Sequence, residues 1–235
     1  MSKWFRGELV ESIQKTAEIK SLTFKIPGFS KFKSGQYSEI RPVANGGSRK
    51  FSIVSSPDKK DQLEFGIQLL KGGEVSPKLF NLKVGDFVQI SRPLGKFYIN
   101  YKKYNPVVLI AGGSGVTPFI SMLRYISKHP VNRQLVLVIS AETKDDIPYS
   151  SEINSFKKRI KNLQVIKTFT GKKSTEGRNG RIDIKLLSEI LEEFSNSYFF
   201  ISGSTSFVDG IWSMLIKLKV PLNHINRERF GPYIY

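Results

Sequence analysis

The chain has 235 residues and carries 37 Lys and Arg against 20 Asp and Glu, a formal net charge of +17. It has no Cys, which excludes disulfides, a cysteine nucleophile and Cys-ligated iron–sulfur clusters, and two His are too few for a His-rich metal site. The excess of basic residues is compatible with nucleic acid, an anionic membrane or an acidic protein as a partner. Its Lys residues are scattered in ones and twos, without a basic tail.

The first hundred residues contain short apolar or alternating runs separated by turn signals such as Pro27-Gly28 and Pro93-Leu94-Gly95. We expect strands at 22–26, 51–54, 63–69 and 87–90. This pattern predicts a small antiparallel barrel or sandwich.

After residue 105 the pattern changes to strands alternating with helices. Continuous apolar runs at 107–111, 135–139, 164–169 and 198–201 indicate buried parallel strands, and amphipathic helical periods lie around them. Ser206 and Asp209 resemble a capping box at the last helix. We predict a doubly wound parallel sheet, with domains at 1–101 and 102–235.

The sequence between the first buried strand and its helix is Gly112-Gly113-Ser114-Gly115-Val116-Thr117-Pro118. Glycines allow backbone N–H groups to approach an anion closely, and a helix N-terminus favours negative charge. Pro118 replaces the third glycine of the usual dinucleotide fingerprint, and no Walker lysine follows. The turn predicts a phosphate or dinucleotide cradle; a tight turn without a ligand is the alternative.

With these motifs in order, nearly the whole chain resembles the ferredoxin–NADP reductase-like flavoprotein superfamily. Arg49 to Ser56 is similar to its flavin motif, and Lys71 to Ser76 to its second flavin-phosphate segment. Gly112 to Pro118 resembles its nicotinamide-nucleotide loop, and Ile201 to Ser204 its Cys-Gly-Pro segment. Glu228-Arg229-Phe230 resembles its C-terminal Glu-x-Phe.

The resemblance implies an N-terminal antiparallel β-barrel that binds FAD tightly but non-covalently, followed by an NAD(P)-binding α/β domain. On the flavin side it implies cofactor contacts from Arg49, Lys50, Phe51, Ser52, Gly72, Gly73, Val75 and Ser76. Ser52 is the expected hydrogen-bond partner of flavin N5, and Phe51 stands where the family has Tyr. A surface salt bridge for Arg49 and a plain turn and helix cap for 72–76 are the alternatives.

On the nucleotide side the resemblance implies contacts from Gly113, Gly115, Thr117, Pro118, Ser140 and Gly203. Ser202 stands where the family has Cys, close to the nicotinamide, and Glu228 is its expected polar neighbour. Ser52, Ser202 and Glu228 are therefore the expected catalytic residues. Tyr235 is the expected aromatic cover of the flavin, with Phe230 and Tyr233 as rivals.

The choice between NADH and NADPH stays open. Glu142 after the second strand of the α/β half favours the free ribose 2′-OH of NADH. Lys172, Lys173, Arg178 and Arg181 provide cations for the 2′-phosphate of NADPH.

The expected function is transfer of hydride from NAD(P)H to flavin N5 and of electrons to a separate acceptor, an acidic ferredoxin or flavodoxin-type carrier. The alternatives are reduction of free flavin, quinone or another small acceptor, and a basic binding protein that kept the fold and lost catalysis. We expect a soluble, cytoplasmic protein, because no apolar run approaches the ~20 residues of a membrane span. Nucleic acid is not an expected partner.

Overall fold

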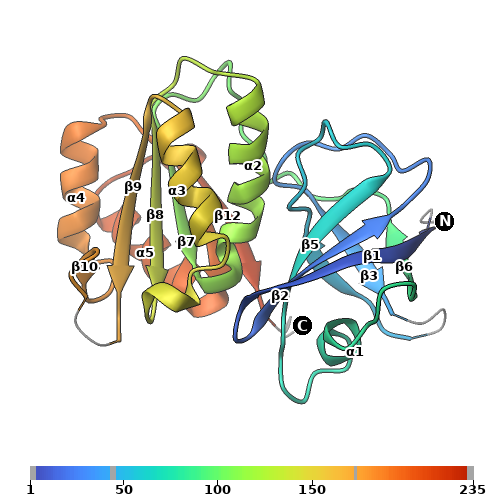
Figure 1. The fold of residues 1–235 in the computed structure, drawn as a ribbon. Helices are drawn as coiled ribbons and strands as arrows, with labels where there is room; N and C mark the ends of the chain where they lie inside the picture. Colours follow the sequence, from blue (N-terminus) through green and yellow to red (C-terminus); the bar gives the residue numbers. More distant parts are fainter. Residues whose placement is uncertain (1–3, 43–45, 172–173, 232–235) are drawn as a thin grey trace. The chain divides into compact units, whose positions relative to one another are not determined.

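A computed structural model describes residues 4–42, 46–171 and 174–231 (Figure 1). The chain divides into two compact units. The first contains residues 1–98 and 117–125, and the second contains residues 99–116 and 126–235.

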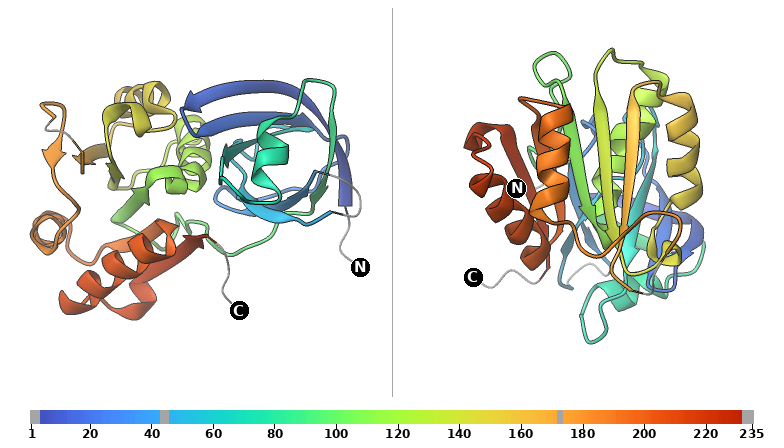
Figure 2. Two further views of the ribbon diagram at one scale, coloured as in Figure 1. Left: turned by 90° about the horizontal axis from the view of Figure 1, so that it is seen from below. Right: turned by 90° about the vertical axis from the view of Figure 1, so that its left-hand side faces the viewer.

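The first unit contains one six-stranded antiparallel sheet with the order β4-β3-β6-β1-β2-β5. Its strands are β1 (Trp4–Thr16), β2 (Ile19–Lys25), β3 (Tyr37–Arg41), β4 (Arg49–Ser52), β5 (Gln62–Gln68) and β6 (Phe87–Ser91). An antiparallel bridge between Ile53 and Phe65 joins the two ends of this order, because Ile53 directly follows β4. The sheet thus curves back on itself, which confirms the predicted antiparallel barrel (Figure 2).

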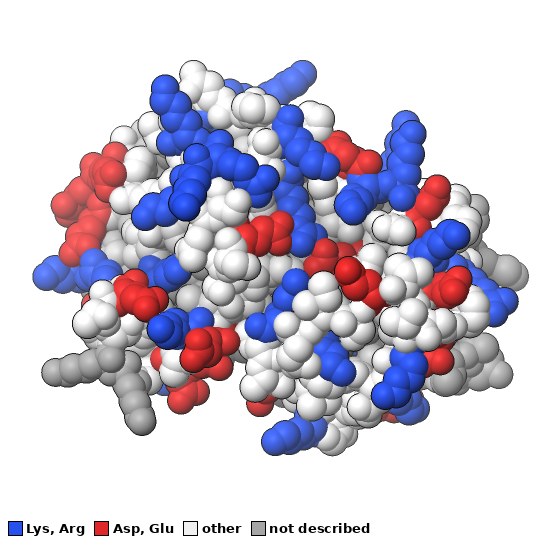
Figure 3. Space-filling model, viewed as in Figure 1, with Lys and Arg blue, Asp and Glu red and all other residues white. Residues whose placement is uncertain are grey.

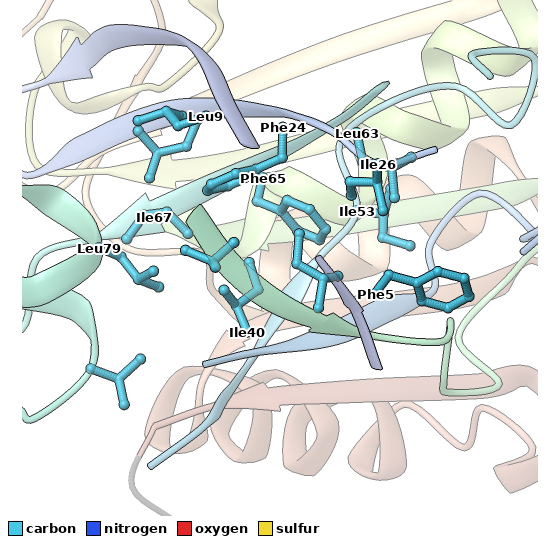
Figure 4. Close-up of a cluster of buried hydrophobic side chains, with 14 of the residues drawn as sticks. Phe5, Leu9, Phe24, Ile26, Ile40, Ile53, Leu63, Phe65, Ile67 and Leu79 are labelled. Atoms are coloured by element: carbon cyan, nitrogen blue, oxygen red, sulfur yellow. The ribbon is translucent and has the colours of Figure 1, made fainter. Parts of the chain in front are cut away.

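Alternation along the strands explains how the barrel forms its core. In β5, Leu63, Phe65 and Ile67 are buried, whereas the residues between them are partly exposed. They pack with Phe24 and other apolar side chains of the neighbouring strands in one cluster (Figure 4). Side chains at every second position of a strand face the same side of a sheet, so this alternation directs one face inward. The short helix α1 (Ser76–Phe80) contributes Leu79 to the same cluster.

The second unit contains a six-stranded parallel sheet with the order β10-β9-β8-β7-β11-β12. Its strands are β7 (Val107–Gly112), β8 (Leu135–Ala141), β9 (Leu163–Phe169), β10 (Arg178–Asn179), β11 (Tyr198–Ser204) and β12 (Ile225–Phe230). The helices in this part of the sequence are α2 (Thr117–Lys128), α3 (Ser150–Arg159), α4 (Ile184–Glu193) and α5 (Thr205–Lys217). Short 3₁₀ turns η1 (Gly113–Val116), η2 (Lys144–Asp146) and η3 (Leu222–His224) complete the elements.

Helices on both faces bury the central strands of this sheet. Every residue of β7 from Val107 to Ala111 is fully buried, as the continuous apolar run predicts. Apolar residues of α4 and α5 form one cluster with one face of the strands, and α3 lies on the opposite face (Figures 1 and 2). The predicted doubly wound parallel sheet is confirmed.

The cap of α5 differs from the prediction. Ser204 is the N-cap residue, and its Oγ accepts a hydrogen bond from the Phe207 N–H at 3.3 Å. Ser206 lies inside the helix instead, so the proposed pair with Asp209 does not cap it. Asp209 instead accepts hydrogen bonds from Arg229.

The strand order reverses between β7 and β11. Strands β8 and β9 continue to one side of β7, and the chain then crosses back to place β11 on its other side. Ligands of open α/β sheets bind beyond the carboxyl ends of the strands at such a switch point. No helix within the described ranges is long and apolar enough to cross a membrane.

Candidate functional site

Strand β4 carries residues predicted to bind the flavin. Arg49 is exposed, and its Nη1 donates a hydrogen bond to the Ser48 carbonyl oxygen at 2.8 Å. Phe51 is partly buried and packs against the barrel core. Ser52 is only 5% exposed, and its buried hydroxyl has no hydrogen-bond partner in the described part of the chain. A buried hydroxyl without a partner is costly, so the Ser52 hydroxyl is one that a bound group or a water molecule can complete.

The second predicted flavin segment forms a tight turn before α1. Gly72 has a φ of 78°, which glycine adopts without strain. The Gly73 N–H donates to the Leu70 carbonyl oxygen at 3.0 Å, and the Leu70 N–H donates to Ser76 Oγ at 3.0 Å. The Gly73 N–H is therefore already used within the turn, whereas the Ser76 hydroxyl keeps its own proton to donate. Val75 is buried.

A hydrogen bond joins the two flavin segments. The Gly47 N–H donates to Glu74 Oε1 at 3.2 Å, and a Cβ on Gly47 would lie 2.8 Å from Glu74 Oε2. The fold thus brings the residues before β4 next to those before α1. No role was predicted for Glu74, and the local signal for its contact is the Gly46-Gly47 pair before β4.

In the second unit, the glycine turn directly follows β7 in the sequence. Its backbone packs closely against that of β11. A Cβ on Gly115 would lie 2.1 Å from the Ser202 carbonyl oxygen, which no side chain can tolerate. Gly113 has a φ of 54°. The turn therefore needs glycine at both positions, and its backbone lies at the switch point of the sheet. Thr117 begins α2 and is 2% exposed, so Pro118 is the second residue of this helix and not its first.

Ser202 occupies the carboxyl end of β11 and is fully buried. Its Oγ has no hydrogen-bond partner among the described residues. In the sheet register Ser202 lies between Ala111 of β7 and the partly buried Glu228 of β12. The half-buried Ser140, the next-to-last residue of β8, pairs with Gly112. The structure therefore brings these predicted nucleotide-side residues to one edge of the parallel sheet.

Phe207 is a residue of this edge that the sequence analysis missed. A Cβ on Gly112 would lie 2.8 Å from its ring, and a Cβ on Gly203, whose φ is 156°, would lie 2.9 Å from it. The ring thus fills the space that both glycines leave. An apolar residue in the first turn of α5, five residues after Ser202, was the available signal.

The flavin-domain model of the oxidoreductases, "Oxidoreductase FAD-binding domain", matches residues 6–99, and "Oxidoreductase NAD-binding domain" matches residues 109–212. The chain belongs to the ferredoxin–NADP reductase-like flavoprotein superfamily. It is an NAD(P)H-dependent flavoprotein reductase that binds FAD.

Relatives of this superfamily match along nearly the whole chain. The reductase component of propane 2-monooxygenase from Mycolicibacterium goodii is 28% identical over 240 residues, which are 98% of this chain and 68% of the relative. The flavodoxin/ferredoxin–NADP reductase of Buchnera aphidicola subsp. Baizongia pistaciae is 27% identical and covers 97% of this chain and 96% of its own. A ferredoxin NADP⁺ reductase from Neisseria gonorrhoeae, solved with FAD and NADP, has the same fold (TM-score 0.85, 18% identity, 97% of this chain and 99% of that one).

The residues of this reductase fit both cofactors. On the flavin side, the buried Ser52 hydroxyl has no partner in the described ranges, and the Arg49 guanidinium is exposed. On the nucleotide side, Gly115 packs against the backbone carbonyl of Ser202, whose buried hydroxyl has no hydrogen-bond partner among the described residues. Tyr235, Tyr233, Lys172 and Lys173 lie outside the described residues, so their predicted roles stay predictions. Phe230 ends β12 beside Ser204 and is half-buried.

One of the cations predicted for a 2′-phosphate, Arg178, has a carboxylate partner. Arg178 Nη1 lies 2.5 Å from Glu189 Oε2, and the nearby Lys144 Nζ lies 3.3 Å from Glu176 Oε1. All four side chains are substantially exposed, so water screens both pairs. Within the described residues no group of three metal-ligating side chains gathers.

Proposed function

We propose that this reductase takes hydride from NAD(P)H and passes the electrons to a separate acidic carrier protein of the ferredoxin or flavodoxin type. The observation that supports its hydride-transfer part most is a pair of buried hydroxyls that have no hydrogen-bond partner among the described residues, Ser52 in the FAD-binding domain and Ser202 in the NAD-binding domain. Both lie in motifs where the superfamily binds its cofactors. When bound, FAD supplies the redox chemistry, accepting hydride at N5 and releasing electrons to the acceptor.

The chain's own residues bind and orient the reacting groups. Arg49 offers a planar, permanently charged group to the flavin pyrophosphate, and Phe51 an aromatic face to the ring system. Ser52 donates or accepts one hydrogen bond at the reacting edge of the flavin. These contacts fix the position of the cofactor, which is how a protein accelerates a transfer between bound groups.

On the nucleotide side the glycine turn and Ser202 have the corresponding roles. The turn between β7 and α2 receives the pyrophosphate with backbone N–H groups. Ser202 and Glu228, adjacent in register, hold the nicotinamide amide and ring edge. Ser202 is smaller than the Cys that the superfamily has there, and we propose that it orients the ring by a hydrogen bond.

The residues permit either nucleotide. The exposed Glu142, just after β8, suits the ribose 2′-OH of NADH. Arg178 and Arg181 are exposed cations that suit the 2′-phosphate of NADPH, although Arg178 must then leave Glu189 or share its charge. The rates of flavin reduction by NADH and by NADPH will decide which nucleotide the protein prefers.

The net charge of +17 supports an acidic acceptor, since opposite charges steer partners into encounter. Lys and Arg side chains are scattered over the face shown in Figure 3, interspersed with Asp and Glu. The net charge would therefore attract an acidic acceptor to this face as a whole and not to one patch. The Buchnera relative is named for flavodoxin and ferredoxin, and the Mycolicibacterium relative for an oxygenase system.

The test compares two acceptors as sodium chloride is raised. Turnover with an acidic [2Fe–2S] ferredoxin should fall by about tenfold or more once the Debye length shrinks to a few ångströms, whereas turnover with ferricyanide should change little. Ferredoxin rates that do not depend on salt, with good rates on quinone or free flavin, would contradict the carrier and support a small acceptor. A purified protein that binds no FAD would support the binding-protein alternative.

A further inference from the structure

Helix α2 connects the glycine turn to the segment of the barrel that follows the flavin motif. The first part of this helix belongs to the same compact unit as the barrel. The fully buried Ser121 donates a hydrogen bond from its Oγ to the Ser55 carbonyl oxygen at 2.6 Å. Arg124 donates one from Nη1 to the Val54 carbonyl oxygen at 3.2 Å. These two carbonyls lie two and three residues after Ser52, the expected hydrogen-bond partner of flavin N5.

Strand β5 binds the same two residues of the barrel. The Val54 N–H donates to the Glu64 carbonyl oxygen at 2.8 Å, and the Glu64 N–H donates to Ser55 Oγ at 2.7 Å. The carboxylate of Glu64 pairs with Arg124 and accepts a hydrogen bond from Ser21 Oγ. One residue of β5 therefore binds both the segment after the flavin motif and the helix that contacts this segment.

These contacts define a position as well as adding stability. Apolar packing is non-directional, whereas a hydrogen bond to a carbonyl oxygen depends on distance and angle. Ser121 and Arg124 are three residues apart and share one face of the helix. Thr117, which is 2% exposed, lies one turn earlier on this face. Two directional bonds and an ion pair from one face therefore fix both the rotation of α2 and its position along its axis.

The expected contacts to the two cofactors lie close to this link along the chain. Thr117 precedes Ser121 by four residues, which is about 6 Å of helix. Ser55 follows Ser52 by three residues, which is about 10 Å of extended chain. The path from Ser52 to Thr117 thus runs through the hydrogen bond between Ser121 and Ser55. A shift at this bond moves one expected cofactor contact relative to the other.

Hydride transfer is sensitive to such a shift, because the reacting atoms must lie about 3–3.5 Å apart and a misplacement of about 1 Å can slow a reaction about a hundredfold. We propose that Ser121 and Arg124 are positioning residues for hydride transfer: their bonds to the segment after Ser52 keep the flavin motif and the glycine turn in register. Both act through the main chain of that segment and not by contact with a cofactor. The inference rests on the proposed function, since hydride transfer is the step that it concerns.

The experiment compares Ser121→Ala and the double variant E64Q/R124M with the parent by anaerobic stopped-flow absorbance. In the double variant the amide oxygen at position 64 keeps an acceptor for Ser21, and no unpaired charge stays buried. Each variant should slow flavin reduction at saturating NAD(P)H about tenfold, because a shift of well under 1 Å is sufficient. The Kd values for FAD and NAD(P)H should stay within about twofold of the parent, because neither variant removes a contact to a cofactor.

Two further measurements separate positioning from general damage. Reoxidation of dithionite-reduced flavin by ferricyanide needs no nicotinamide, so its rate should be the same in the parent and in both variants. Ser197→Ala is the matched control, because it removes a buried hydroxyl that donates to the Phe194 carbonyl oxygen at 2.6 Å in the second unit. This control should reduce its flavin at the rate of the parent.

Flavin reduction at the parent's rate in either Ser121→Ala or E64Q/R124M would overturn the proposal. Equal slowing in Ser197→Ala would also overturn it, as would a matching loss of FAD affinity or of the reoxidation rate, because the variants would then damage the protein generally. A parent whose flavin neither nucleotide reduces would contradict the proposed function and this inference with it. Normal reduction of the parent with unchanged rates in the variants would contradict this inference alone.

Discussion

Arg124 of α2 and Glu64 of β5 form an ion pair in which Nη1 and Oε2 are 2.5 Å apart. Both side chains are largely buried, with 20% and 15% of their surfaces exposed. Arg124 Nη1 also donates to the Val54 carbonyl oxygen at 3.2 Å, and Ser121 Oγ donates to that of Ser55 at 2.6 Å. The first unit thus holds α2 against the segment that follows the flavin motif.

The pair makes the stability depend on pH. Burial alone would raise the pKa of Glu64, but the charge of Arg124 and hydrogen bonds from Arg124 and Ser21 outweigh it and lower the pKa. A carboxyl whose pKa is lower in the folded protein stabilises it above the unfolded pKa, and this contribution is lost as the pH falls through the folded pKa. The stabilisation is therefore complete near neutral pH and disappears in acid.

Glu64→Gln should lower the free energy of unfolding by about 2–3 kcal/mol near neutral pH, because Arg124 then stays buried without a counter-charge. Urea unfolding of parent and variant across a pH series measures this. The difference should shrink as the pH falls below the usual range of a Glu. A difference that is constant down to strongly acidic pH would show that the charge of Glu64 does not contribute.

Gly115→Ala should raise the KM for NAD(P)H about tenfold, or about 1.4 kcal/mol, while FAD content stays unchanged. The new Cβ would clash with the Ser202 carbonyl oxygen, so the turn must move away from β11. The matched control is Gly210→Ala in α5, where a Cβ meets nothing within 4 Å. Steady-state rates with ferricyanide measure both variants, and an unchanged KM in Gly115→Ala would contradict the assignment of this turn.

Ser202→Ala should slow flavin reduction by NAD(P)H about fivefold to tenfold, the loss expected for one hydrogen bond of about 1 to 1.4 kcal/mol. Anaerobic stopped-flow absorbance measures this step directly. Ser204→Ala, which removes the α5 cap, is the control and should lower stability by about 1 kcal/mol without slowing reduction. If flavin reduction were slowed equally in Ser202→Ala and Ser204→Ala, the cause would be a disturbance of the end of β11 and not the loss of the Ser202 hydroxyl.

Arg49→Gln should weaken FAD binding by about tenfold or more, because a hydrogen bond to a charged phosphate contributes about 1.5–3 kcal/mol. Lys59→Gln removes an exposed charge from the same unit and should leave FAD binding nearly unchanged. Titration of the apoprotein with FAD, followed by flavin fluorescence, measures both. Equal dissociation constants for the two variants would contradict the role of Arg49.

The elements that the sequence predicted are those with strong local patterns. The apolar run at 107–111 and the glycines after it defined β7 and its turn, because burial on both faces leaves a continuous apolar sequence. Strand β1 was missed since its second half, from Glu11 to Thr16, is polar and mostly exposed. Strand β12 was missed because it lies at the edge of the sheet and is only partly buried.

The candidate site likewise contains residues that a local sequence pattern predicts and residues that no local pattern predicts. Arg49, Ser52 and Ser202 were predicted from motifs that are contiguous in sequence. The pair of Glu64 with Arg124 joins residues 60 positions apart, and nothing in either local sequence indicates the partner. The contact of Phe207 with two glycines likewise depends on how α5 returns over the end of β7.

The most direct test of the central claim is an anaerobic titration of the purified protein with NADPH and, separately, NADH, followed by visible absorbance. A reductase of this kind should be yellow with bound FAD and lose its flavin absorbance on addition of one equivalent of at least one nucleotide. A protein that stays colourless after addition of FAD, or yellow protein that neither nucleotide bleaches, would contradict the assignment.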